Sequence, residues 1–189
     1  MNLERFYYAV VILWPLSEAA LAMTRRAKLP EARLQDRGTT WKLWLIILAG
    51  IGAGLALQSR RFGRIGLAPT VVVPLGLALI LLGLAIRWAA ILVLGGSFTV
   101  NVSVAPGQRV IRRGPYRYVR HPSYTGSLLA FLGLGVSLGN WVGLVALFLP
   151  ILAGFLYRIR VEERALVESL GEEYLEYRRA TKRLLPGLY

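Results

Sequence analysis

The sequence predicts an all-α integral membrane protein, a helical bundle of about five transmembrane helices followed by a cytosolic C-terminal helix. Hydrophobic residues make up 56% of the 189 residues and the mean hydropathy is +0.53, whereas soluble domains contain about 45–50% apolar residues. The apolar residues form blocks near the ~20 residues that cross a ~30 Å hydrocarbon core. Basic residues separate these blocks, and the net charge is +13.

The blocks define the predicted membrane spans, which are residues 6–23, 41–57, 70–94, 125–138 and 141–157. Ala20-Leu21-Ala22 resembles a signal-peptide cleavage site, but we expect the first block to remain as a span. The third span could end before Arg87, whose side chain would then extend to the interface. The last two spans are short and form a tight hairpin, because only Gly139 and Asn140 separate them.

Glu18 and the charged stretch after the last span lead to two further predictions. Glu18 lies inside the first span, where a carboxylate is costly. It either lines a substrate path or lies near the cytosolic interface, where it could pair with a basic loop residue. Beyond the last span, residues 168–182 are charged and predict a surface helix, with Tyr174 and Tyr177 anchoring one face.

The distribution of Lys and Arg predicts the orientation in the cell membrane. With five spans, the first loop, the loop before the fourth span and the tail share one side, which collects 18 basic residues against four on the other. The positive-inside rule then places the N-terminus outside and the C-terminus in the cytosol. The same rule explains the positive charge without a nucleic-acid partner. The chain has no cysteine and one histidine, so we expect no metal site.

The densest polar sequence is Gly114-Pro-Tyr-Arg-Tyr-Val-Arg-His-Pro-Ser-Tyr-Thr-Gly126, directly before the fourth span. Pro122 suits the first position of a helix, and it biases His121 toward extended geometry. The N–H groups of the next three residues would then be free to bind an anion at the cytosolic edge. Gly126 would allow a ligand or a neighbouring backbone to approach closely.

A second polar motif follows the fifth span, in which Arg158 and Glu162 are four residues apart and share a helix face. Because the hairpin is tight, the end of the fifth span must return beside the start of the fourth. We therefore expect Glu162 and Glu163 to lie close to His121. Taken alone, these motifs could also be a topology anchor and a surface ion pair.

Together the motifs resemble the isoprenylcysteine carboxyl methyltransferase family. The resemblance rests on Arg120-His-Pro-Ser-Tyr-Thr-Gly126, Arg158-x-x-x-Glu162-Glu163-x-x-Leu166 and Gly171-Glu-Glu-Tyr-Leu-Glu-Tyr177, and it covers residues 97–189. It implies a membrane-embedded methyltransferase that uses S-adenosyl-L-methionine in a pocket facing the cytosol, under a C-terminal roof. The chain would then divide into three N-terminal spans, residues 1–95, and a cofactor-binding half, residues 96–189, with the hairpin at 125–157.

The resemblance also implies roles for individual residues. Arg120 and Arg158 are candidates to orient an acidic acceptor or the cofactor carboxylate. Glu162 or Glu163 would bind ribose hydroxyls or the cofactor's amino group. The expected cofactor cradle consists of Tyr116, His121, Pro122, Tyr124 and Gly126, with no metal.

The acceptor remains open at this stage. A chain this short resembles the prokaryotic members of the family, so we expect a small lipid-like or prenylated acceptor, methylated on a carboxylate, which needs no general base. Methylation of a phospholipid amine is the close alternative, with Glu162, Glu163 or a tyrosine as the base. Readings from other classes are an NADPH-dependent sterol-type reductase and a non-catalytic membrane scaffold.

Overall fold

A computed structural model describes residues 2–24, 38–59, 62–98, 107 and 109–189, and the backbone alone of residues 33–34 and 103–104. Several basic residues behind the orientation prediction lie outside the described residues or have undescribed side chains. They are Arg25, Arg26, Lys28, Arg33, Arg37, Arg60 and Arg61.

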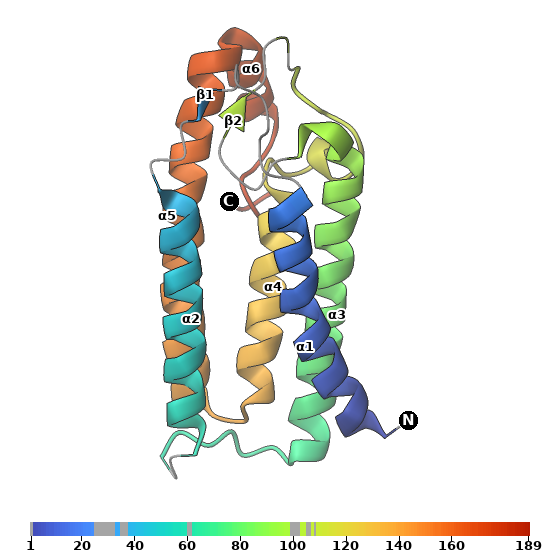
Figure 1. The fold of residues 1–189 in the computed structure, drawn as a ribbon, viewed down its shortest axis with the longest axis vertical. Coiled ribbons are helices and arrows are strands. Elements are labelled where there is room, and N and C mark those ends of the chain that lie inside the picture. The colour runs from blue at the N-terminus through green and yellow to red at the C-terminus, as the bar shows by residue number, and fades with distance from the viewer. Residues whose placement is uncertain are drawn as a thin grey trace.

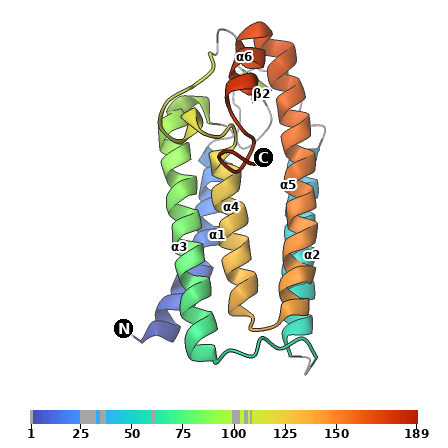
Figure 2. The same cartoon turned by 180° about the vertical axis from the view of Figure 1, so that it is seen from behind.

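Five long helices run up and down in alternation (Figures 1 and 2). They are α1 (Leu3–Thr24), α2 (Thr39–Gln58), α3 (Pro69–Leu94), α4 (Pro122–Ser137) and α5 (Trp141–Leu170). A sixth helix, α6 (Glu172–Ala180), lies at the end opposite the N-terminus. The short elements are the 3₁₀ turns η1 (Gly95–Ser97) and η2 (Gly114–Arg117), and the strands β1 (Arg33–Leu34) and β2 (Ser103–Val104), which pair antiparallel.

Four of these helices, α1, α2, α3 and α5, are long and apolar enough to cross a membrane. Helix α4 has 16 residues and is the short span expected from the sequence. Large apolar side chains face outward along the bundle, where lipid would cover them, such as Leu13 at 62% and Leu45 at 53% exposed. The predicted integral membrane bundle is therefore confirmed, with α4 as its shortest member.

Two pairs of helices pack closely in the bundle. Helices α3 and α4 approach at glycines, because a Cβ on Gly126 would lie 2.4 Å from the Gly83 carbonyl oxygen, and one on Gly133 would lie 2.5 Å from that of Gly76. Helix α2 lies along α5, where a Cβ on Gly50 would lie 2.9 Å from the Leu147 carbonyl oxygen. Both pairs join the first half of the chain to the second.

The turn between α4 and α5 is held from both sides. Gly139 adopts a positive φ of 63°. The Asn140 side-chain oxygen accepts hydrogen bonds from the N–H groups of Val142 and Gly143, and so caps α5. The Asn140 amide donates to the carbonyl of Phe62 in the α2–α3 loop, at 3.1 Å. This fixed turn determines which residues of α4 and α5 lie side by side.

The predicted surface helix at residues 168–182 is interrupted. Helix α5 continues past the apolar stretch to Leu170, and Gly171, with a φ of 56°, separates it from α6. Tyr174 and Tyr177 on α6 are buried, as expected for the anchoring face.

Candidate active site

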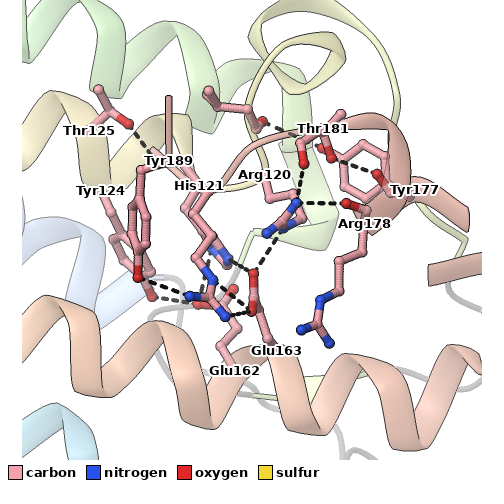
Figure 3. Close-up of polar contacts among 12 residues, drawn as sticks. Arg120, His121, Tyr124, Thr125, Glu162, Glu163, Tyr177, Arg178, Thr181 and Tyr189 are labelled. Carbon is pink, nitrogen blue, oxygen red and sulfur yellow. Dashed lines mark hydrogen bonds and ion pairs between the residues drawn. The ribbon is translucent and has the colours of Figure 1, made fainter. Parts of the chain in front are cut away.

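The tight hairpin brings the start of α4 beside the end of α5, as expected (Figure 3). His121 is 5% exposed. Its Nδ1 lies 3.8 Å from a Glu162 oxygen, and its Nε2 lies 3.5 Å from a Glu163 oxygen. The two polar motifs of the sequence therefore meet in one buried cluster.

Glu163 is the electrostatic centre of this cluster. Arg120 Nε donates to one carboxylate oxygen at 2.8 Å, and the Arg183 guanidinium binds the other at 3.0 and 3.1 Å. The Glu163 side chain is 5% exposed. Its charge is thus compensated by two arginines, in addition to the nearby imidazole.

Glu162 has a different environment. Its side chain is 29% exposed, and it accepts a 2.8 Å hydrogen bond from the Tyr124 hydroxyl. The same hydroxyl accepts a hydrogen bond from Arg158 Nε at 3.0 Å. Tyr124 therefore joins Glu162 to Arg158, and its ring stacks on His121 with centroids 5.6 Å apart.

Arg158 connects the cluster to α2. It is 4% exposed, and its Nη1 donates to the hydroxyls of Thr39 and Thr40, each at 3.0 Å. The shared helix face with Glu162 is confirmed, with the Tyr124 hydroxyl between the two side chains.

A cavity of about 900 Å³ runs through the bundle beside this cluster. One face of α4 lines it along the helix, through Tyr124, Ser127, Phe131, Leu134 and Ser137. Its walls are mostly apolar. Asn2, Glu4 and Gln58 line it at the end near the N-terminus, and five further polar residues line the end beside the cluster, which we call the polar end. They are Glu18, Thr40, Arg87, Tyr124 and Arg158.

The C-terminal segment covers the cluster from the other side. The N–H groups of Arg120 and His121 donate to the carbonyls of Lys182 and Arg183, at 2.8 and 3.0 Å. Arg120 Nη1 also donates to the carbonyls of Arg178 and Thr181. Arg120 therefore fastens the end of α6 to the start of α4.

Tyr116 lies in η2 and is buried. The Tyr177 hydroxyl donates to the Tyr116 carbonyl at 2.6 Å. Burial raises the pKa of Tyr177 to about 12, and burial, together with the charge of Glu162, raises that of Tyr116 further. Both phenols are therefore protonated at neutral pH.

The structure corrects the predicted start of α4. Pro122 does occupy the first turn, and His121 has a φ of −124°, but its ψ of 56° falls short of extended backbone. The N–H groups of Tyr124 and Thr125 are not free, because both donate to the His121 carbonyl at 3.0 Å. Gly126 packs against the backbone of α3, so the close approach of a neighbouring backbone, one of the two alternatives for this glycine, is confirmed.

Arg87 and Glu18 form a second buried polar group. The predicted third span to Leu94 is confirmed, and the alternative end before Arg87 is not found. The Arg87 guanidinium binds Glu18 and donates to the hydroxyls of Ser123 and Ser127, both at 2.9 Å. Glu18 thus pairs with a basic residue of a neighbouring span, not of a loop. Both residues line the polar end of the cavity.

Several members of the site were missed from the sequence. Thr39 and Thr40 carried no signal beyond their position at the start of a span, and Arg183 stood out only as one of many basic tail residues. A charge inside an apolar stretch, as at Arg87, was the one signal that could have suggested a buried partner.

Comparison with known proteins agrees with the resemblance. Residues 76–168 match the model of the isoprenylcysteine carboxyl methyltransferase (ICMT) family. Protein-S-isoprenylcysteine O-methyltransferase A of Arabidopsis thaliana is 39% identical over 104 residues, which are 54% of this chain and 53% of the relative. The Schizosaccharomyces pombe protein-S-isoprenylcysteine O-methyltransferase is 30% identical over 156 residues, 76% of this chain and 66% of that protein.

The chain spans about half the length of the plant relatives that it matches. The structural similarity covers more of the chain than the sequence similarity does. The structure of a eukaryotic intramembrane Ras methyltransferase, an ICMT, matches 98% of this chain and 67% of its own, with a TM-score of 0.62 and 22% identity. Through residues 76–168, this chain belongs to the isoprenylcysteine carboxyl methyltransferase family.

Proposed function

We propose that this protein transfers a methyl group from S-adenosyl-L-methionine to the carboxylate of a lipid-like acceptor at the edge of the membrane. One observation carries the proposal. Tyr124 belongs both to the wall of the apolar cavity and to the polar cluster, where its hydroxyl meets Glu162 and Arg158. A greasy acceptor and a polar cofactor would therefore meet at this residue.

The polar cluster has the chemistry to hold the cofactor. Among the described residues, His121 Nε2 is buried and makes no well-formed hydrogen bond, although a Glu163 oxygen lies 3.5 Å away, and buried polar atoms rarely remain unpaired. Glu162 is a partly exposed carboxylate that suits an ammonium group or a ribose diol, whereas Glu163 is already compensated by two arginines. When bound, S-adenosylmethionine supplies an electrophilic methyl group on a sulfonium. We assign the cofactor contact to His121 and Glu162, and a supporting role to Glu163.

The acceptor side favours an anionic group. Arg158 is a buried cation at the polar end of the cavity, with the hydroxyls of Tyr124 and Thr40 beside it. Arg158 would orient a carboxylate, which is already ionised and needs no general base. Holding the acceptor in line and excluding water can contribute about 7–11 kcal/mol to lowering the barrier. We assign orientation of the acceptor to Arg158. Arg120 does not line the cavity, and we assign to it a structural role that holds the end of α6 against the start of α4.

The relatives are named for prenylated cysteine, so a prenylcysteine carboxylate is the first acceptor to test. The alternative, a phospholipid amine, would bring a second positive charge to the end of the cavity where Arg158 lies. The proposed orientation places the cluster and the C-terminus on the cytosolic side. In the described residues that side carries the arginines of residues 109–117 and of α5 and α6, against Arg5 in the first turn of α1 and Arg64 between α2 and α3.

The test is methyl transfer by the purified protein in lipid nanodiscs, with methyl-labelled S-adenosylmethionine. The acceptors are an N-acetylated S-farnesylcysteine, its carboxamide as the matched control, and phosphatidylethanolamine. We expect label only on the free carboxylate, released as methanol by base because the product is an ester. Base-stable label on phosphatidylethanolamine would replace the proposal with amine methylation. A melting temperature raised by NADPH, and not by S-adenosylhomocysteine, would contradict methyl transfer altogether.

A further inference from the structure

Two buried side-chain atoms in the described part of the chain have no hydrogen-bond partner, His121 Nε2 and the Tyr174 hydroxyl. The imidazole belongs to the cluster described above, but the role of Tyr174 is unassigned. A buried phenol normally finds a partner for its O–H group. An unpaired one on a helix that covers the cluster indicates that the partner is a bound molecule.

The fold sets Tyr174 firmly in place. The positive φ of Gly171 turns the chain from α5 into α6, and Tyr174 and Tyr177 are three residues apart on the same face of α6. Their side chains are buried, and their ring centroids lie 6.0 Å apart. Glu173 fixes the start of α6 by accepting a 3.1 Å hydrogen bond from the N–H of Val110.

The neighbouring tyrosine provides an internal comparison. The Tyr177 hydroxyl donates to the Tyr116 carbonyl at 2.6 Å, so its polar atom is satisfied by the protein. Tyr174 is buried to the same degree, at 3% against 4% exposed, but its hydroxyl has no such carbonyl. Two equally buried tyrosines of one helix face therefore differ in whether the hydroxyl has a protein partner.

The charges around Tyr174 show which chemistry it faces. Burial raises its pKa, and the negative charges of Glu163 and Glu162 raise it further. The phenol is therefore a protonated donor within electrostatic reach of both carboxylates. Arg120 lies among the same charges and partly offsets them. A neutral hydroxyl could accept a hydrogen bond from Tyr174 and donate one to Glu162.

We infer that Tyr174 is a further cofactor-binding residue, whose buried hydroxyl donates a hydrogen bond to the ribose half of the cofactor and makes α6 one wall of the pocket. This inference rests on the proposed function, because it takes S-adenosylmethionine as the ligand. It does not require Tyr174 to touch the acceptor or the transferred methyl group.

The experiment compares Tyr174→Phe with Tyr177→Phe, each of which removes one hydroxyl from the same helix face. The dissociation constant of S-adenosylhomocysteine is measured by calorimetry, and the melting temperature is measured without ligand. Tyr174→Phe should weaken binding roughly three- to ten-fold and leave the ligand-free melting temperature unchanged or raised. Tyr177→Phe should lower the ligand-free melting temperature and change the affinity less than Tyr174→Phe does.

The outcomes separate the two proposals. If the wild-type protein binds S-adenosylhomocysteine and Tyr174→Phe binds it equally well, the hydroxyl is satisfied by water and the inference is overturned, while the proposed function stands. If Tyr174→Phe lowers the ligand-free melting temperature as Tyr177→Phe does, the hydroxyl has a structural partner and the inference is again wrong. If the wild-type protein does not bind the ligand at all, both proposals fail.

Discussion

Arg158 and Tyr124 share a hydrogen bond at the boundary between the apolar cavity and the polar cluster, with Nε donating to the phenolic oxygen at 3.0 Å. Both residues line the cavity. The Tyr124 hydroxyl also reaches Glu162, so one contact couples the acceptor side of the proposed reaction to the cofactor side.

The first prediction concerns Arg158. Arg158→Lys keeps the positive charge but loses the planar guanidinium, which donates hydrogen bonds to three hydroxyls at once. We expect methyl transfer to fall roughly a hundredfold, because a misplaced acceptor forfeits much of the alignment advantage, while S-adenosylhomocysteine affinity changes little. Arg160→Lys, on the exposed side of the same helix, is the matched control and should behave as wild type. Full activity of Arg158→Lys would remove Arg158 from the acceptor site.

The second prediction separates the two adjacent glutamates. Glu162→Gln should weaken S-adenosylhomocysteine binding about tenfold or more, because a charge-assisted hydrogen bond is lost, with a small effect on stability. Glu163→Gln should lower the unfolding free energy by about 3 kcal/mol, because it leaves the buried Arg120 and the partly exposed Arg183 without a carboxylate. Calorimetric binding and denaturant titration measure the two effects. The opposite pattern would exchange the two assignments.

The relation between these motifs could be predicted because the hairpin loop is short. Helix α4 ends at Ser137 and α5 begins at Trp141, so residues similarly far from the turn must lie close together. His121 and the two glutamates lie at similar distances from the turn, at the end of the hairpin opposite to it. The sequence thus predicted the cluster, and it also predicted the apolar helices, since their lengths follow from bilayer thickness.

The contacts that were missed join helices without such a constraint. Thr39 and Arg158 are 119 positions apart, and Glu18 and Arg87 are 69 positions apart. Nothing in their local sequence fixes the register of α1 against α3, or of α2 against α5. Hydropathy likewise marked the membrane boundary near Tyr157 but not the helix end, because α5 continues as a charged helix until Gly171.

The third prediction concerns the Glu18–Arg87 pair, whose side chains are 14% and 11% exposed. Removing one partner leaves a buried charge uncompensated, so Glu18→Leu or Arg87→Leu alone should cost about 3–5 kcal/mol. The double variant should recover most of that loss, because no charge is then buried, although Ser123 and Ser127 lose their donor. A double-mutant cycle on unfolding free energies measures the coupling. Additive losses would mean that the two side chains do not depend on each other.

The fourth prediction reassigns Gly126 from the cofactor to the frame of the bundle. An added Cβ would lie 2.4 Å from the Gly83 carbonyl oxygen and 2.6 Å from the Arg87 amide nitrogen, which are backbone atoms that cannot rotate away. Gly126→Ala should therefore separate α3 from α4 and destabilise the protein by about 1–3 kcal/mol or more. Gly52→Ala is the control, because nothing lies within 4 Å of its Cβ and alanine favours the helix by up to about 1 kcal/mol. Melting temperatures in detergent distinguish the two variants. If Gly126→Ala melted as wild type but lost S-adenosylhomocysteine binding, the glycine would belong to the cofactor pocket after all.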